Sequence, residues 1–456
     1  IEVNAIEPQC GTNLTVGASG DTITFPTGTT IVNNGTQTGF GRTGTVDWDT
    51  TPKTATFSAV SGNGYFCNTS GGAFTVNLPA GVAGAIVSFA DYTRTFQTNN
   101  LTITPNGSEK IGGVAANFVA QTEGQSITLV YVDATEGWIN TAESTGQSGL
   151  NPAFITATGG TITTVDTDYK VHTFTGPGTF TVCSAGNPLG SSTVDYMVVA
   201  GGGGGGTGTS SAAAGGAGGG GAGGFRETTG CGYTSSPLGA CVSSLPVAAT
   251  GYPITIGAGG TAPHPGSAND GSNSVFAAIT STGGGGGGSA GLNGLSPGNP
   301  GGSGGGGGGS GNSGSGTGTG GSGNTPAVNP AQGTNGGTTT GPSRPAAGGG
   351  GATVVGENGG PTGSPTAAFG GAGATTSING SPTAFAGGGG GGRGSLGTGG
   401  TGGTGGGGTG AGDGGASTAG TTNTGGGGGG SGDEGAPSLS GSSGGSGIVI
   451  IRYKFQ

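Results

Sequence analysis

Apolar residues recur at every second position in many short stretches of the chain, a pattern that predicts half-buried β-strands. The clearest examples are Ala73–Leu78, Ala85–Phe89 and Ser126–Val132. Turn residues such as Asn99-Asn100 and Asn106-Gly107 separate these stretches at regular intervals, as antiparallel hairpins require. We therefore predict an antiparallel β-sandwich or small barrel in residues 45–146, within an all-β fibrous chain, and we predict no helix.

Residues 1–44 contain shorter alternating segments, including Leu14-Thr15-Val16 and Thr22-Ile23-Thr24-Phe25, which glycine and proline interrupt. Strands this short cannot form a domain alone, but several chains wound side by side would bury them. This region is predicted to be a fibre shaft segment in a homotrimer.

Residues 147–193 resume the two-residue alternation, most clearly in Tyr169–Phe174 and Gly178–Val182. We predict a β connector here. Together with Val194–Ala200 it would form a small β-layer, to which Gly251–Ile256 and Ser274–Ile279 are added later in the chain.

The remaining region, residues 194–456, is dominated by glycine runs such as Gly201–Gly206, Gly283–Gly288 and Gly387–Gly392. Such runs lack the side chains of a packed strand, and each glycine disfavours helix by roughly 1 kcal/mol relative to alanine. Polyproline-II geometry leaves every amide free to bond to a neighbouring run, so we predict a polyglycine-II bundle. A flexible tether is the alternative, but the apolar strands Val194–Val199 and Ile448–Tyr453 bracket the region, and a tether would not need to close on itself.

Composition narrows the classes of function. The chain has 456 residues, a net charge of −10 and only 7% charged residues, and no basic cluster exists that could hold a phosphate backbone. We expect no nucleic acid partner, and no membrane insertion, because no run of 18 apolar residues occurs. The first residues include neither a starting Met nor a signal-peptide pattern, so the natural beginning is expected to lie upstream.

Catalytic chemistry has little support in the sequence. Gly301–Gly305 matches a hydrolase pattern through composition alone, and His172 and His264 lie far apart with no carboxylate motif beside them. Asp166 and Asp168 fall on one strand face, but such pairs are more often a solvated edge. We expect no catalytic, cofactor or metal site.

The segments between glycine runs carry residues suited to contact. These are Phe225, Tyr233, Leu238, Leu245, Arg344, Ile378 and Phe385. They either pack the ends of the bundle or form an exposed patch for a receptor. Cys231 and Cys241 share one such segment, where they are a possible disulfide or two free thiols.

If successive runs alternate in direction, the segments leave the bundle at its two ends in turn. With the chain entering at Val194, we expect the receptor-facing end to include parts of Phe225–Thr250, Asn324–Ala347 and Ala374–Ala386.

Two stretches resemble known families. The segments Leu14–Ile23, Val76–Gly81 with Phe89–Tyr92, Asn99–Ile103 and Leu129–Trp138 resemble bacteriophage tail-fibre proteins. Thr193–Gly201, closing with Ser446–Tyr453, resembles the glycine-rich domain common at the ends of phage fibres. In design, the glycine runs also resemble phage adhesins whose polyglycine-II sandwich carries specificity loops.

The resemblance implies a homotrimeric tail fibre of the virion, joined to upstream tail or baseplate proteins. Its glycine-rich tip would adsorb to a bacterial surface receptor, an outer-membrane protein or a glycan, without catalysis. A structural subunit of a bacterial surface fibre or extracellular filament is the alternative.

Overall fold

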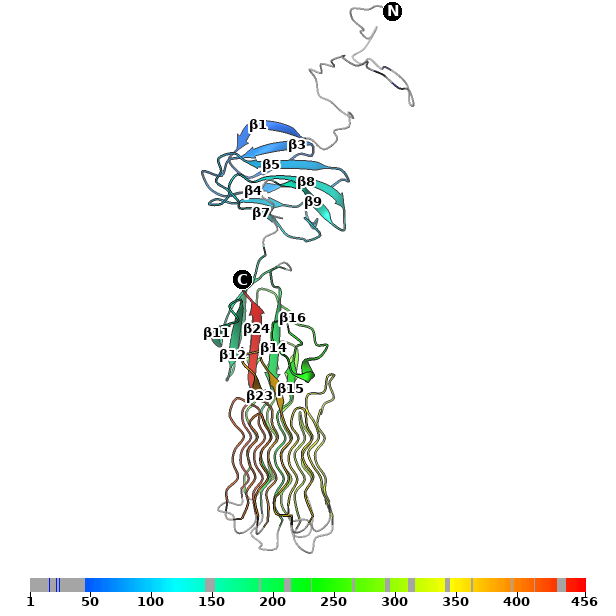
Figure 1. The fold of residues 1–456 in the computed structure, drawn as a ribbon, viewed down its shortest axis with the longest axis vertical. Coiled ribbons are helices and arrows are strands. Elements are labelled where there is room, and N and C mark those ends of the chain that lie inside the picture. The colour runs from blue at the N-terminus through cyan, green and yellow to red at the C-terminus, as the bar shows by residue number, and fades with distance from the viewer. Residues whose placement is uncertain are drawn as a thin grey trace, which may run out of the picture.

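The computed structural model is elongated, with an N-terminal domain, a β-layer and a glycine bundle following one another along its length (Figure 1). It describes Val16, Thr22, Thr24, residues 46–143 and residues 152–456. The second span omits residues 188–189, 209–214, 231, 265–266, 292–295, 311–315, 341–344, 362–363, 395–396, 414 and 433–439. The predicted shaft of residues 1–44 lies outside the described residues apart from the three named.

The N-terminal domain is built from two sheets. Its strands are β1 (Asp47–Lys53), β2 (Phe57–Ser58), β3 (Asn63–Cys67), β4 (Phe74–Asn77), β5 (Ile86–Asp91), β6 (Leu101–Thr104), β7 (Phe118–Ala120), β8 (Ser126–Asp133) and β9 (Gly137–Glu143). One sheet has the order β1-β3-β5-β8-β9 and the other has the order β2-β4-β6-β7. Trp138, Phe89, Phe96 and Phe118 are fully buried in the core between them.

The predicted antiparallel sandwich is wrong for much of this domain. β1, β3 and β5 pair in parallel, as do β2, β4 and β6, because the chain passes to the opposite sheet after each strand. Many of the turn residues therefore mark corners between the sheets rather than hairpins. Only β7, β8 and β9 add antiparallel pairs.

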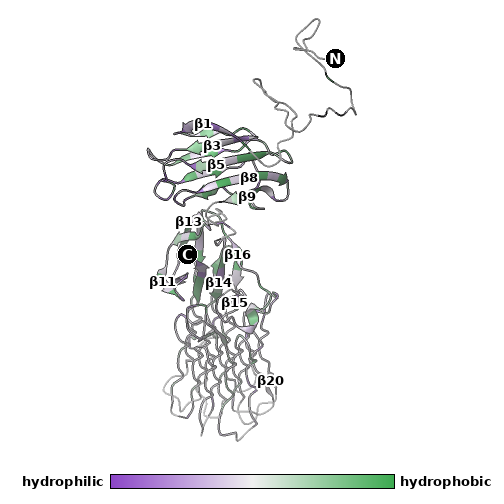
Figure 2. Cartoon of the chain, turned by 45° about the horizontal axis from the view of Figure 1, so that its top comes forward, coloured by the Kyte–Doolittle hydropathy of each residue, from purple (hydrophilic) through white to green (hydrophobic). Residues whose placement is uncertain are grey.

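The β-layer also contains two sheets. Its strands are β10 (Ile155–Thr158), β11 (Thr161–Val165), β12 (Tyr169–Phe174), β13 (Gly178–Ala185), β14 (Thr193–Val199), β15 (Phe225–Glu227), β16 (Leu245–Pro246), β17 (Gly251–Thr255), β18 (Ser274–Phe276), β19 (Ile279–Ser281) and β24 (Ile448–Lys454). The orders are β10-β13-β17-β18-β19 and β11-β12-β24-β14-β15, with β16 beside β14. In Figure 2 green apolar segments lie on the strands of this layer and of the N-terminal domain.

The closure predicted from the bracketing strands is confirmed. β14 and β24 lie side by side and pair antiparallel from Val199↔Ile448 to Asp195↔Arg452. β12 pairs with the other edge of β24, so this strand of the predicted connector belongs to the same sheet as the bracketing strands. The strands at 251–255 and 274–276 join the same layer, as predicted.

Between β14 and β24 the chain runs back and forth in extended glycine-rich segments that bond to one another rather than internally. The amides of Gly201 and Gly204 donate to the run 267–273, those of Gly202 and Gly205 to the run 440–447, and those of Gly203 and Gly206 to the run 215–224. The hydrogen-bond partner therefore changes with a period of three residues. Successive runs alternate in direction, as the falling residue numbers of the acceptors require.

One run, residues 215–224, lies at the centre of this bundle. It exchanges backbone hydrogen bonds with the runs 200–208, 282–291, 303–310, 345–352, 386–394 and 425–432. The surrounding runs contain the longest uninterrupted glycine stretches of the sequence. Outer runs such as 397–403 instead carry an exposed threonine at every third position, as at Thr398 and Thr401.

Three further short elements complete the described structure of this region. They are the strand pairs β20 (Thr317–Gly318) with β21 (Thr339–Thr340) and β22 (Ala374–Thr376) with β23 (Thr383–Phe385), and the 3-10 turn η1 (Pro237–Gly239). Within the described residues η1 is the only helical element, in line with the all-β prediction.

Candidate functional site

The glycine bundle has two chemically different ends. At the near end, where the runs meet β14, β15 and β24, the first side chains are apolar. Ala222, Phe225, Phe385 and Ile448 belong to one buried cluster there, which joins the bundle to the β-layer.

This cluster corrects part of the predicted contact surface. Phe225, Ile378 and Phe385 are 1%, 0% and 4% exposed, so they pack the near end and cannot touch a receptor. Where the runs end and the β-layer begins, glycine has no side chain to fill the space between them. Large apolar side chains fill it instead.

The remaining predicted contact residues are half-buried or undescribed. Tyr233 and Leu238 pack against the near-end cluster, and Leu245 packs against the neighbouring cluster of the β-layer. Tyr233 Oη donates a hydrogen bond of 3.0 Å to Thr228 O, and burial raises the pKa of its phenol. Arg344 lies outside the described residues.

The expected polarity of the segments is therefore wrong for two of them. Phe225–Thr250 and Ala374–Ala386 lie at the near end, beside the β-layer (Figure 1). Asn324–Ala347 spans both ends, because Gln332 accepts the amide of Phe225 at the near end, and the run from residue 333 then leads away from it.

The possible disulfide remains a prediction. Cys241 is an exposed free thiol, and Cys231 lies outside the described residues.

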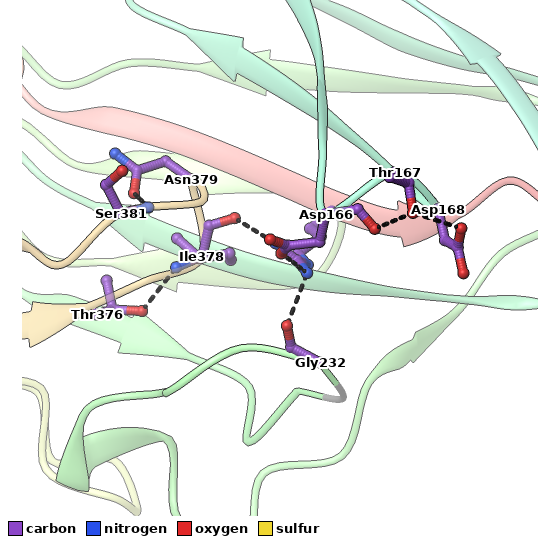
Figure 3. A network of polar contacts seen from close by, with 9 residues as sticks. Asp166, Thr167, Asp168, Gly232, Thr376, Ile378, Asn379 and Ser381 are labelled. Atoms are coloured by element: carbon purple, nitrogen blue, oxygen red, sulfur yellow. Dashed lines mark hydrogen bonds and ion pairs between the residues drawn. The ribbon is translucent and has the colours of Figure 1, made fainter.

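A polar network that includes Asp166, Gly232 and Ile378 joins the near-end segments (Figure 3). Its central residue is Arg452 of β24. Its side chain is fully buried, and Nη2 lies 2.8 Å from both Asp166 Oδ2 and Gly232 O. Nη1 lies 3.5 Å from Ile378 O, and the guanidinium stacks 4.1 Å from the ring centroid of Tyr169. Asp166, one of the two acids singled out in the sequence, therefore serves as a partner of this arginine.

A second fastening is a buried carboxyl group. Glu227 is 1% exposed and accepts hydrogen bonds from the Ser236 amide, at 2.9 Å, and from the Thr376 hydroxyl. Burial raises the pKa of Glu227 above its ordinary 4.5, and these hydrogen bonds oppose the rise. Together with Arg452, it ties the segment after β15 to the β22–β23 hairpin, so the near end is a fixed junction.

The far end carries buried polar side chains. At the last or next-to-last described residue of five runs, a buried hydroxyl or guanidinium side chain replaces glycine. These side chains are Thr207, Ser310, Thr339, Arg393 and Ser431. We name this set the far-end floor.

Hydrogen bonds join the floor across the runs. Thr207 Oγ1 lies 3.2 Å from Ser289 Oγ, and Thr339 Oγ1 donates to Gly307 O at 3.2 Å. Sequence analysis missed this set, although its signal was present: each of Thr207, Ser310, Arg393 and Ser431 directly follows an uninterrupted glycine stretch.

Two pockets open on the β-layer. One, of about 300 Å³, is lined mainly by apolar residues including Ile155, Ile162 and Phe455. The other, of about 340 Å³, is lined by polar groups including Asp195, Ser244 and Lys454. In the second pocket Ser244 Oγ donates a hydrogen bond to Asp195 Oδ1, which also accepts one from Thr228 Oγ1. No histidine is among the residues that line either pocket.

The histidines do not form a reactive group. His172 is fully buried, with Nδ1 2.7 Å from Gly159 O and Nε2 3.1 Å from Tyr453 Oη, and desolvation lowers its pKa. His264 is exposed.

Across the described parts of the chain no group of three or more His, Cys, Asp or Glu residues could hold a metal ion. Among the same residues no helix is long and apolar enough to cross a membrane.

Comparison with protein families gives a match to a model described as a glycine-rich domain, over residues 174–454. The match begins at the end of β12 and closes at the end of β24, so it takes in most of the β-layer together with the bundle. No curated protein sequence matches the chain.

Proposed function

The chain belongs to the glycine-rich domain family, and from that premise we propose that it is the receptor-binding tip of a bacteriophage tail fibre. In this proposal the far end of the bundle adsorbs to a bacterial surface receptor without catalysis. The observation that carries it is the contrast between the two ends: the near end is joined to the β-layer through a buried apolar cluster, whereas the far end carries the polar floor and no described contact with the β-layer.

We infer that the bundle consists of polyglycine-II helices. The three-residue period of its hydrogen bonds supports this inference, because polyproline-II geometry has three residues per turn and no internal hydrogen bonds. Each run then has rigid, bonded neighbours. Connecting segments mounted on such runs would lose less entropy on binding than segments on a tether.

The stretches of sequence between the runs differ widely. Residues 209–214, 311–315 and 433–439 range from serine and alanine to the acidic stretch that contains Asp433 and Glu434. Variable segments on a constant scaffold are typical of recognition surfaces. The receptor would be an outer-membrane protein or a glycan, and trimerisation would add avidity.

Segment exchange tests the proposal. Residues 209–214 and 433–439 are replaced by glycine-serine segments of equal length, and binding of the labelled full chain to a panel of bacterial strains is measured by flow cytometry. The near-end turn Asn379–Pro382 is replaced in the same way as a control. We expect the far-end variants to lose binding by at least about 10-fold on the strain that the parent chain binds, and the control to retain it.

Equal binding by all three variants would overturn the far end as the contact surface. If the chain binds no strain but assembles end to end in electron micrographs, the filament alternative takes its place.

A further inference from the structure

The N-terminal domain exposes aromatic rings on the outer face of its larger sheet. Trp48 of β1 and Tyr92, just after β5, are 43% and 55% exposed, and Phe66 of β3 lies between them. The ring centroids of Trp48 and Phe66 are 4.9 Å apart, and those of Phe66 and Tyr92 are 6.2 Å apart. We call these three rings the aromatic platform.

The alternation along β3 explains why the platform faces outward. Tyr65 and Cys67 point into the core, so Phe66 must point the other way. Gly64 makes room for the indole, since a Cβ atom there would lie 2.8 Å from Trp48 Cδ2. Trp48 and Phe66 are thus held by strands, and Tyr92, which follows β5, is anchored by a hydrogen bond of 2.9 Å from its amide to Cys67 O.

Small uncharged groups continue the face beside the rings. In register across the sheet, Trp48 is followed by Gly64, Ser88 and Thr128. The two hydroxyl groups are 2.8 Å apart, and Ser88 is only 3% exposed, so Thr128 is the more accessible of the two. The nearby charges include two ion pairs, Asp49 with Lys53 at 2.8 Å and Arg94 with Glu123 at 3.8 Å. Asp91, directly before Tyr92, accepts hydrogen bonds from backbone amides.

We propose that the aromatic platform binds a neutral glycan. The C–H-rich face of a pyranose ring stacks on an aromatic ring, and its hydroxyl groups can bond to the phenol of the exposed Tyr92, which is the chemistry that this face offers. With two neutral ion pairs and the Asp91 carboxylate beside the rings, the local charge disfavours an acidic ligand.

The available area favours a glycan over a second copy of the chain. The exposed parts of Trp48 and Tyr92 amount to on the order of 200 Å². A stable protein interface needs about 800 Å² from each partner. Such an area suits one or two sugar rings. This inference does not depend on the proposed receptor contact at the far end, and it stands even if that proposal is wrong.

The two tryptophans provide the measurement. Trp48 is exposed and Trp138 is fully buried, so ligand on the platform changes the emission of Trp48 alone. The full chain is titrated with maltoheptaose, cellohexaose, chitohexaose and a mannan oligosaccharide, with polygalacturonate as the acidic comparator. We expect at least one neutral glycan to shield Trp48 from acrylamide quenching, and polygalacturonate to have no effect.

Variants sharpen the result. Tyr92→Ala should weaken binding by about 10-fold, while Val82→Ala, an equally exposed apolar change on the same domain, should leave it unchanged. Trp48→Leu should abolish the signal, and calorimetric titration of Tyr92→Ala still tests the platform if Trp48→Leu does not fold. The proposal fails if none of the four neutral glycans protects Trp48. It also fails if Tyr92→Ala lowers the sedimentation mass of the chain, because the platform would then be a contact between copies.

Discussion

At the scale of single residues, the bundle depends on the fact that glycine has no side chain. A Cβ atom on Gly220 would lie 2.2 Å from Gly203 O, and one on Gly389 would lie 2.1 Å from Gly428 O. These contacts involve backbone atoms that are themselves hydrogen-bonded, so the neighbouring run cannot move aside. Glycine is required here for close approach, not for a special backbone angle.

Gly220→Ala is therefore expected to destabilise the tip by about 3 kcal/mol or more, because overpacking against fixed backbone cannot relax. Gly415→Ala is the matched control, since its Cβ atom would meet nothing nearer than 3.7 Å. Thermal unfolding of both variants measures the difference. Equal stability of the two would contradict the close packing of the central run.

His172 gives the protein a pH dependence of known sign. Burial lowers its pKa below the ordinary 6.5, so the unfolded chain takes up a proton that the folded chain does not. The stability due to the neutral ring is present above about pH 6.5 and is lost as the pH falls toward the lowered folded pKa. Glu227, with its raised pKa, acts in the opposite direction: its contribution is lost as the pH rises from 4.5 through its folded value.

His172→Phe separates the two effects. The ring still packs edge-on to Phe180 but no longer titrates. In denaturant unfolding, lowering the pH from 7.5 to 5 should reduce the free energy of unfolding more in the parent chain than in the variant. An identical pH profile for the two proteins would show that His172 is not a source of the pH dependence.

At the scale of elements, β24 joins the parts of the tip. It lies between β12 and β14, and its Arg452 bonds to the carbonyls of two segments that are distant in sequence. The ion pair with Asp166 contributes less, because that carboxylate is 54% exposed and water screens it.

We expect Arg452→Met to destabilise the tip by about 3 kcal/mol, since buried carbonyls lose their donors, and Asp166→Asn by less than about 1 kcal/mol. Chemical unfolding of both variants provides the comparison. A larger effect of Asp166→Asn would show that the ion pair, and not the carbonyl contacts, holds the junction.

Sequence patterns predicted which residues form strands better than they predicted which strands pair with each other. The bracketing strands could be inferred, because strand formation depends on local composition. The parallel pairing of β1, β3 and β5 could not, since a two-residue period is the same in parallel and antiparallel strands. Phe225 and Phe385 were misassigned because a large apolar residue after glycine has the same sequence pattern in a buried junction and on a surface.

On the scale of the whole molecule, the chain enters and leaves the bundle at the same end. β14 and β24 are paired neighbours, so the glycine runs between them project away from the N-terminal domain (Figure 1). The far-end floor is thereby carried to the extremity of the molecule, although it is central in the sequence.

The trimer predicted from residues 1–44 is tested on this scale. Sedimentation equilibrium of the full chain should give three times its mass of 41.8 kDa. A mass of one chain at micromolar concentration would leave the short strands of that region without the partners they were expected to need.

The bundle of hydrogen-bonded glycine has a thermodynamic consequence. Unfolding normally raises the heat capacity by about 12–15 cal/mol/K per residue, mainly because apolar surface becomes hydrated, whereas exposed peptide groups lower it. The runs around residues 215–224 bury peptide groups and little else. Calorimetry should therefore give the tip a heat-capacity increment per residue well below that range. Its stability curve would be flat, so the bundle would stay folded across a wide span of temperatures, in the cold as well as in the heat.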